Sequence, residues 1–213
     1  MSDAAALLQT ISAAIADAAQ VARREPDDVT LVAVSKNRSA EEIEALIEAG
    51  QRHFGENRVQ EAAGKWPSLR ARYPDITLHM IGRLQSNKAD EAAALFDVIH
   101  SLDRPSLASA LARAEWKGPT YLQVNIGEEE QKGGVAIADL PGFIDNVRES
   151  GLNLAGLMAI PPAEVEPSPY FALLAKLARR HDVSGLSMGM SGDFRSAVML
   201  GATVVRVGTA LFE

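Results

Sequence analysis

The sequence contains no cysteine, which excludes disulfide bonds, thiolate metal ligands and a cysteine nucleophile, and which fits a reducing compartment such as the cytoplasm. Basic residues are outnumbered, 21 against 28 acidic ones, and they form no cluster along the chain. The resulting net charge of -7 argues against a nucleic-acid partner. No apolar run approaches the roughly 20 residues that a membrane span requires, so we expect no membrane partner either.

Several sequence motifs are also missing. No G-x-G-x-x-G follows the first predicted strand, and no Walker A loop occurs, so the common dinucleotide and P-loop signatures are absent. There is no H-E-x-x-H and no clustered acidic triad. His53, His100 and His181 show no metal-ligand spacing. We therefore expect no metal site.

What the 213 residues do contain is a regular alternation of β-branched apolar runs with amphipathic, alanine- and glutamate-rich stretches. The predicted strands are Val29–Lys36, His53–Glu56, Thr77–Gly82, Val98–Leu102, Thr120–Ile126, Leu154–Ile160, Gly185–Met190 and Thr203–Leu211. The predicted helices between them are Ala40–Ala49, Val59–Arg72, Asn87–Leu95, Pro105–Glu115, Ala138–Glu149, Pro169–Arg180 and Phe194–Leu200. An apolar stripe in Met1–Arg24 predicts one more helix, which docks on the domain.

Eight apolar strands, each followed by a helix-sized segment, predict a single (β/α)8 TIM-type barrel over residues 1–213 with an extra N-terminal helix. An open doubly wound sheet is the alternative, although such sheets usually stop at five or six strands. A barrel places its functional residues at the carboxyl ends of the strands. Those positions therefore decide which chemistry we expect.

The first predicted strand closes on Lys36, and a lysine at this face of a barrel can lose solvation and act as an imine-forming nucleophile. The alternative is a surface lysine that merely ends the strand. Asn57 and His79 also lie at or near strand ends. Either of them alone is more often a polar core residue than a catalyst.

The last quarter of the chain holds the strongest pattern. Ser191 and Gly192 follow the seventh strand, and Gly208 and Thr209 lie in the eighth. The loops after these two strands are the usual phosphate site of a TIM barrel. Because strand eight neighbours strand one in a closed barrel, a phosphate cradle would lie beside Lys36. A phosphorylated aldehyde or ketone fits that pairing, either a sugar phosphate in an aldolase or pyridoxal 5'-phosphate.

Arg206 bears on the choice between these ligands. It can donate a hydrogen bond to a pyridine nitrogen and keep that nitrogen unprotonated, because a guanidinium does not act as a general acid. An arginine against a substrate phosphate is the competing use of the same residue.

Together these residues resemble the pyridoxal phosphate homeostasis protein family. The matching segments are LVAVSK at 31–36, HFGENRVQE at 53–61, HMIGRLQSNK at 79–88, QVNIGEEEQKGG at 123–134, GLMAI at 156–160, SMGMSGDF at 187–194 and VRVGTALF at 205–212. The resemblance implies a barrel similar to the N-terminal domain of alanine racemases, with pyridoxal phosphate held as a Schiff base on Lys36. It further implies phosphate contacts from Ser191, Gly208 and Thr209, a contact from Arg206 to the pyridine nitrogen, and Asn57 and His79 beside the ring.

From this resemblance we expect a cytoplasmic, monomeric protein that takes part in pyridoxal phosphate homeostasis without robust turnover. Its candidate partners are apo-enzymes that require the cofactor. The alternative is a true enzyme, either an amino-acid racemase or a Schiff-base aldolase. The racemases that the barrel resembles take a second acid/base from a tyrosine of another domain, and Tyr73, Tyr121 and Tyr170 offer no obvious substitute.

Overall fold

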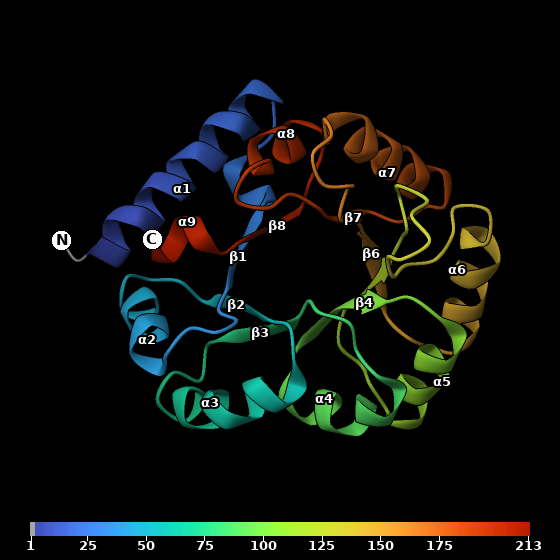
Figure 1. The fold of residues 1–213 in the computed structure, drawn as a ribbon, viewed down its shortest axis with the longest axis horizontal. Coiled ribbons are helices and arrows are strands. Elements are labelled where there is room, and N and C mark those ends of the chain that lie inside the picture. Colours follow the sequence, from blue (N-terminus) through green and yellow to red (C-terminus); the bar gives the residue numbers. More distant parts are fainter. Residues whose placement is uncertain (1–2) are drawn as a thin grey trace.

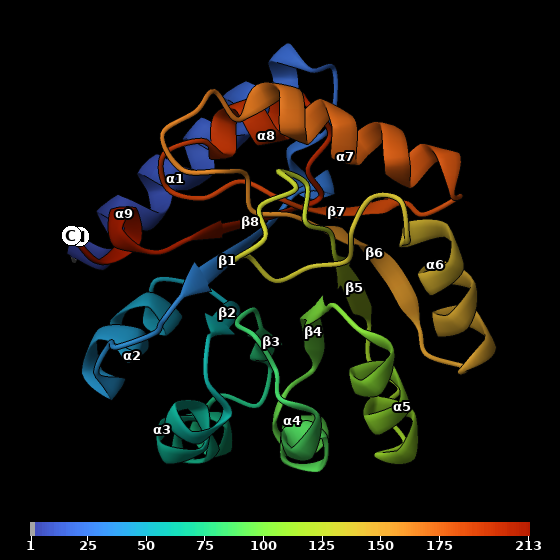
Figure 2. The same cartoon turned by 45° about the vertical axis from the view of Figure 1, so that its right-hand side comes forward.

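The computed structural model describes residues 3–213, which form a closed barrel of eight parallel strands surrounded by helices (Figures 1 and 2). The strands are β1 (Thr30–Val34), β2 (His53–Glu56), β3 (Thr77–Met80), β4 (Val98–Leu102), β5 (Thr120–Gln123), β6 (Leu154–Met158), β7 (Gly185–Ser187) and β8 (Val204–Val207). Closure is direct, because β1 pairs with β8 on one side, Thr30 opposite Val204, and with β2 on the other, Ala33 opposite Phe54. The predicted (β/α)8 barrel is confirmed, and the open sheet is excluded.

The helices lie on the outside of the barrel (Figure 1). They are α1 (Asp3–Val21), α2 (Ala40–Glu48), α3 (Val59–Arg72), α4 (Ala89–Leu95), α5 (Pro105–Arg113), α6 (Leu140–Glu149), α7 (Ser168–Arg180), α8 (Phe194–Met199) and α9 (Thr209–Phe212), with short 3-10 turns η1 (Pro26–Asp28) and η2 (Ser86–Lys88). The seven helices predicted between the strands are all present, with ends that shift by at most two residues. The predicted N-terminal helix ends at Val21, three residues before Arg24, and Met1 and Ser2 lie outside the described residues. The hydrophobic period was sufficient to locate them.

Most strands end earlier than the apolar runs predict. The run in β5 was expected to reach Ile126, but pairing as a strand ends at Gln123. Val124 and Ile126 are nevertheless buried, at 2% and 3% exposure. Apolar residues can thus be covered by loop packing without a strand ladder, which is why an apolar run overestimates strand length.

The prediction for β8 was wrong in kind as well as in length. Thr209–Phe212 is helix α9 and not the end of a strand. Gly208 precedes the helix with φ of -109° and ψ of -93°, which turns the chain out of the ladder. Leu211 is then buried in the core that the outer helices share with the strands.

Helix α1 packs on the outside of the barrel beside α8 and α9 (Figure 1). Its buried stripe consists of Ile11, Ala14, Ile15, Ala18 and Ala19. By length and composition alone α1 is long and apolar enough to cross a membrane, so the expectation that no segment approaches this length was wrong. In the structure the stripe packs on the protein, as predicted for a docking helix.

The barrel interior has its own small apolar cluster, separate from the larger core between strands and helices. Its members are Val32, Val98, Tyr121, Met158 and Val204. Tyr121 needs glycines opposite its ring, because a Cβ added to Gly156 or Gly185 would lie 2.4 or 2.9 Å from its Cε1 atom.

Candidate functional site

A cavity of about 220 Å³ opens at the carboxyl ends of β1 and β8. It is lined by Val34, Lys36, Arg38, Met190, Ser191, Arg206, Gly208 and Thr209. Five of the seven residues predicted to bind a cofactor therefore surround one space, although they come from opposite ends of the sequence. Barrel closure is the cause, since it places the loop after β1 beside the loops after β7 and β8.

Lys36 lies in a turn two residues beyond the end of β1, and its side chain is exposed. The prediction that the strand extends to Lys36 was therefore wrong, and of the two alternatives for its side chain the exposed lysine is the one observed. The residue before it, Ser35, is fully buried, and its Oγ donates to Glu56 Oε1 at 2.7 Å. The backbone on which Lys36 sits is thus anchored, while the amine remains free to reach a ligand.

Glu56 is the centre of this anchor. It is fully buried at the end of β2, where its Oε1 also accepts a hydrogen bond from Trp66 Nε1 at 3.0 Å. Lys65 Nζ lies 2.9 Å from the same oxygen and donates to the Ser35 carbonyl at 2.8 Å. Helix α3 therefore fixes the loop that carries Lys36, through a buried ion pair that is itself fully hydrogen-bonded at one carboxylate oxygen.

The opposite wall of the cavity consists of hydroxyl and amide groups. The Gly208 N–H donates to Ser191 Oγ at 3.2 Å, which ties the loop after β7 to the end of β8. Thr209 is exposed at the start of α9. A Cβ added at Gly208 would lie at an ordinary contact distance of 3.5 Å from Val34, so the backbone here is in contact with the end of β1 without being crowded. Hydroxyl groups such as those of Ser191 and Thr209 can bind an anion such as a phosphate.

Arg206 supplies a buried positive charge at the floor of the cavity. It is 4% exposed, and among residues 3–213 it forms no ion pair with a carboxylate. Its Nη1 donates to Ser187 Oγ at 2.6 Å and its Nη2 to the Ala159 carbonyl at 3.1 Å. Burial lowers the pKa of this guanidinium to about 10, which still leaves it protonated at neutral pH. The negative charge of Asp193 acts in the opposite direction and raises this pKa, but it is not in contact with the guanidinium. A buried cation with no carboxylate in direct contact favours an electron-rich ligand at this point.

A continuous chain of hydrogen bonds runs from Arg206 down through the barrel. Ser187 Oγ lies 2.8 Å from His100 Nδ1, His100 Nε2 lies 2.9 Å from His79 Nδ1, and His79 Nε2 lies 3.0 Å from His53 Nδ1. The strand register explains this arrangement. In the order His53, His79 and His100, each histidine lies one inward-facing position closer to the carboxyl face of the barrel. Individually the histidines had no spacing that predicted this chain.

One hydrogen bond of this series has a fixed direction. A guanidinium only donates, so Ser187 Oγ accepts from Arg206. The directions of the bonds between Ser187, His100, His79 and His53 depend on the histidine tautomers, and one set of neutral tautomers lets Ser187 donate to His100, His100 to His79 and His79 to His53. Burial is the largest cause that lowers the pKa of all three imidazoles, that of His79 to about 3, so the chain is neutral. Arg206 is its only charged member.

Two predicted site residues do not line the Lys36 cavity. His79 is buried within the barrel at 3% exposure and reaches Arg206 only through the chain. Asn57 lines a second cavity, beside the ends of β2 and β3. Conversely, Arg38 and Met190 line the Lys36 cavity without having been predicted. Only adjacency to Lys36 or Ser191 in the sequence could have indicated them.

Tyrosines and metal ligands were also part of the sequence argument. Within residues 3–213 no tyrosine lines the Lys36 cavity, since Tyr121 is buried against His100 and the Tyr73 hydroxyl donates to Glu44. The same residues contain no group of three or more histidine, aspartate or glutamate side chains placed to hold a metal ion.

The comparison with known proteins is consistent over the full length. Residues 8–213 match the family model for the alanine racemase N-terminal domain. A protein of Pseudomonas aeruginosa called pyridoxal phosphate homeostasis protein is 41% identical over 100% of this chain and 96% of its own length. Its namesake in Escherichia coli K12 is 38% identical over 100% of this chain and 97% of its own.

Solved structures agree with these sequence matches. The structure of PipY from Synechococcus elongatus with pyridoxal phosphate bound is 40% identical, covers 93% of this chain and 100% of its own, and superposes with a TM-score of 0.80. The alanine racemase of Corynebacterium glutamicum is 17% identical, with 96% of this chain and 60% of its own covered and a TM-score of 0.69. At that identity the racemase establishes the shared barrel only.

Proposed function

The chain belongs to the pyridoxal phosphate homeostasis protein family, and we propose that it holds pyridoxal 5'-phosphate as a Schiff base on Lys36 and takes part in supplying or buffering the cofactor. Binding of pyridoxal phosphate agrees with the family name and with the cofactor in PipY. The observation that carries the proposal is the Lys36 cavity itself. It joins an exposed lysine, two hydroxyl side chains and a buried arginine that forms no ion pair within residues 3–213.

Each wall of the cavity has a role in this proposal. The Lys36 amine binds the aldehyde carbon, while Ser191, Gly208 and Thr209 hold the phosphate at the opposite wall. Arg206 donates to the pyridine nitrogen from the floor of the cavity.

The two remaining residues act from the edges of this site. Asn57 borders the ring from the loop after β2, whereas His79 acts from below by keeping Arg206 in place through His100 and Ser187.

The same arrangement favours storage over turnover. When bound, pyridoxal phosphate supplies a reactive aldehyde and an electron sink for carbanions. Arg206 gives up no proton to the ring nitrogen, which weakens that sink. An amino-acid racemase or a Schiff-base aldolase is the alternative function.

We further propose that residues 1–213 work as one cofactor-binding domain and that the protein acts as a cytoplasmic monomer. The Pseudomonas aeruginosa and Escherichia coli relatives are bacterial proteins. Apo-enzymes that need the cofactor are the proposed recipients, because an exposed lysine in an open cavity can release its ligand by hydrolysis or exchange.

Covalent attachment can be tested directly. The purified protein is mixed with pyridoxal phosphate, reduced with borohydride and digested for mass spectrometry. We expect a single modified peptide that contains Lys36, loss of the modification in Lys36→Ala, and no change in Lys117→Ala, whose lysine is also exposed. Equal labelling of several lysines, or none at Lys36, would refute the proposed attachment.

A further inference from the structure

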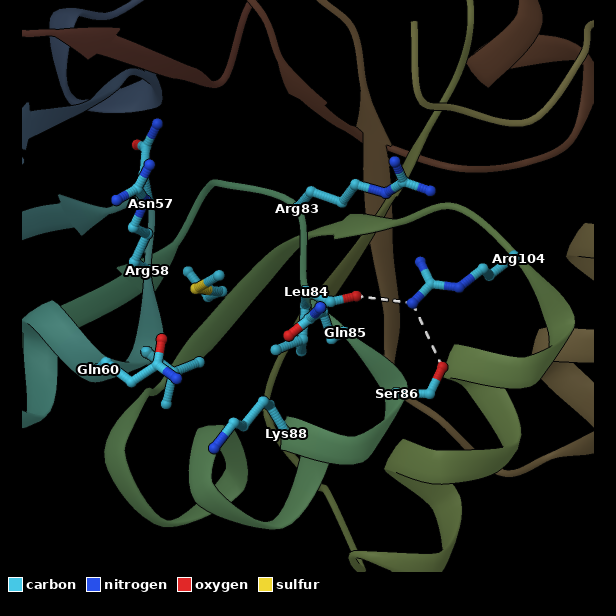
Figure 3. Close-up of a pocket in the computed structure, with 11 residues that line it drawn as sticks. Asn57, Arg58, Gln60, Arg83, Leu84, Gln85, Ser86, Lys88 and Arg104 are labelled. Atoms are coloured by element: carbon cyan, nitrogen blue, oxygen red, sulfur yellow. Dashed lines mark hydrogen bonds between the residues drawn. The ribbon is translucent and has the colours of Figure 1, made fainter.

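A second, larger cavity of about 580 Å³ lies beside the ends of β2 and β3, and it shares no lining residue with the Lys36 cavity. Its lining residues are Asn57, Arg58, Val59, Gln60, Met80, Arg83, Leu84, Gln85, Ser86, Lys88 and Arg104 (Figure 3). Its volume is that of a typical small-molecule site. The proposed cofactor function accounts for only one of these residues, Asn57.

The lining is strongly positive in an otherwise acidic protein. Four cations face the cavity, and no carboxylate lines it. Two of the charges are offset, since Lys88 pairs with Glu91 and Arg104 with Asp103. Arg58 and Arg83 form no ion pair within residues 3–213. The cavity therefore has a net excess of about two positive charges available to a ligand.

Part of this wall is already held in position. Arg104 Nη2 donates to the Leu84 carbonyl at 2.7 Å and to Ser86 Oγ at 3.2 Å, and both bonds are drawn in Figure 3. In that view Arg58 and Gln60 lie on one side of the cavity, while Arg83 and Arg104 lie on the other. Cations thus approach the space from three different loops, which suits an anion with several oxygens.

The cavity is formed by closely packed backbone. A Cβ added at Gly82 would lie 2.2 Å from the Asn57 carbonyl oxygen, so the loops after β2 and β3 touch directly. Below the cations, Val59, Met80 and Leu84 are buried and provide an apolar floor. A ligand with a charged head and a flat or apolar body would match both surfaces.

We propose that this cavity is a second binding site, which takes a phosphorylated small molecule with a flat or apolar body. Arginine guanidinium groups bind phosphate through paired, charge-assisted hydrogen bonds, and the apolar floor accommodates the remainder of the ligand. The inference does not depend on cofactor binding at Lys36, because the cavities share no lining residue and Asn57 is the only residue here with a part in the proposed cofactor site.

Phenyl phosphate is a suitable probe, since it has a phosphate and a flat ring but no aldehyde for Lys36. Calorimetric titrations use two forms of the protein in which the Lys36 cavity is disabled. One carries pyridoxal phosphate fixed on Lys36 by borohydride, and the other is Ser191→Ala with Thr209→Val. If Lys36 does not accept the cofactor, the proposed function fails, and the second form still tests the cationic cavity.

We expect one phenyl phosphate per chain in both forms, about tenfold weaker binding in Arg58→Met and in Arg83→Met, and no change in Arg113→Met. Arg113 is a matched control because it is exposed at the end of α5, outside both cavities. In the proteins that retain both Arg58 and Arg83, the affinity for phenyl phosphate should also fall as the sodium chloride concentration rises from 50 to 200 mM.

Three results would overturn the proposal. They are no binding of phenyl phosphate, binding that neither arginine substitution nor salt weakens, and binding of a polyglutamate peptide in place of phenyl phosphate. The last result would assign the surface to an acidic protein segment.

Discussion

Ser187 connects a permanent cation to a neutral imidazole, with its Oγ 2.6 Å from Arg206 Nη1 and 2.8 Å from His100 Nδ1. The hydroxyl is suited to this position because it can accept from Arg206 and donate to the imidazole at the same time. Its bonds hold the guanidinium under the Lys36 cavity and orient the neutral chain of His100, His79 and His53.

Ser187→Ala should therefore destabilise the protein by about 1–3 kcal/mol, because His100 Nδ1 and one Arg206 donor would lose their partner in a buried site. Ser101→Ala is the matched control. Ser101 Oγ is also buried, but among residues 3–213 it has no hydrogen-bond partner, so removing it should be neutral or stabilising. Urea unfolding of both variants measures the difference, and equal effects would contradict the role of Ser187.

The three barrel histidines should make the protein sensitive to acid. Their pKa values are lowered in the folded state, to about 3 for His79, whereas the unfolded chain takes up protons near pH 6.5. Below that pH the unfolded state binds more protons, so their contribution is complete above about pH 6.5 and is lost as the pH falls.

Each fully neutral histidine should cost about 1.4 kcal/mol of unfolding free energy per pH unit below 6.5. Urea unfolding between pH 5 and 7.5 measures this slope. His79→Gln should flatten the slope even if it lowers stability overall. His181→Gln should leave the slope unchanged, because His181 is not part of the hydrogen-bonded series of histidines. Identical slopes in all three proteins would contradict the neutral chain.

The sequence predicted the framework of this site better than its interior. Hydrophobic periodicity located eight strands and the helices between them, and closure then placed Lys36 beside Gly208. Periodicity carries no information on which inward-facing polar residues share a layer. That depends on strand register, and His79 could not be linked to His100 before Val98 was seen opposite His79.

The exposure of individual side chains could not be predicted from the sequence either. Lys36 was predicted to end the first strand, with a desolvated or a surface side chain as alternatives, but the ladder ends at Val34 and the exposed lysine lies in a turn. Thr209 was predicted to lie in a strand because the segment VRVGTALF at 205–212 is rich in apolar residues. The last four residues of that segment, Thr209–Phe212, form a helix instead. Short apolar segments are compatible with either structure until their packing partners are known.

The buried pair of Glu56 and Lys65 should be the most costly ion pair to break. Lys65→Met leaves the Glu56 carboxylate buried without its cation, which should cost about 3–5 kcal/mol in urea unfolding. Adding Glu56→Gln to Lys65→Met should recover part of that loss. Lys88→Met, which breaks a surface pair with Glu91, should cost at most about 1 kcal/mol. Equal losses from both single lysine variants would contradict the anchoring role of Glu56.

Recognition of the phosphate should be separable from covalent attachment. Ser191→Ala with Thr209→Val should weaken pyridoxal phosphate binding about tenfold per hydroxyl, while leaving binding of phosphate-free pyridoxal unchanged. Lys36→Ala should instead abolish the covalent bond and retain non-covalent affinity for the phosphate. Equilibrium dialysis with both vitamers makes the comparison. Unchanged preference for the phosphorylated form in the double variant would place the phosphate elsewhere.

The last prediction is that amino acids are not racemised at enzyme-like rates. A two-base racemase needs a second proton carrier opposite the lysine, and a well-placed base is worth about 10²- to 10⁴-fold in rate. Within residues 3–213 the cavity beside Lys36 has no tyrosine, and Arg38 stays protonated and cannot serve as a base. Incorporation of solvent deuterium into alanine, with Lys36→Ala as control, should be slower than about 1 s⁻¹. A faster, lysine-dependent rate would establish the racemase alternative instead.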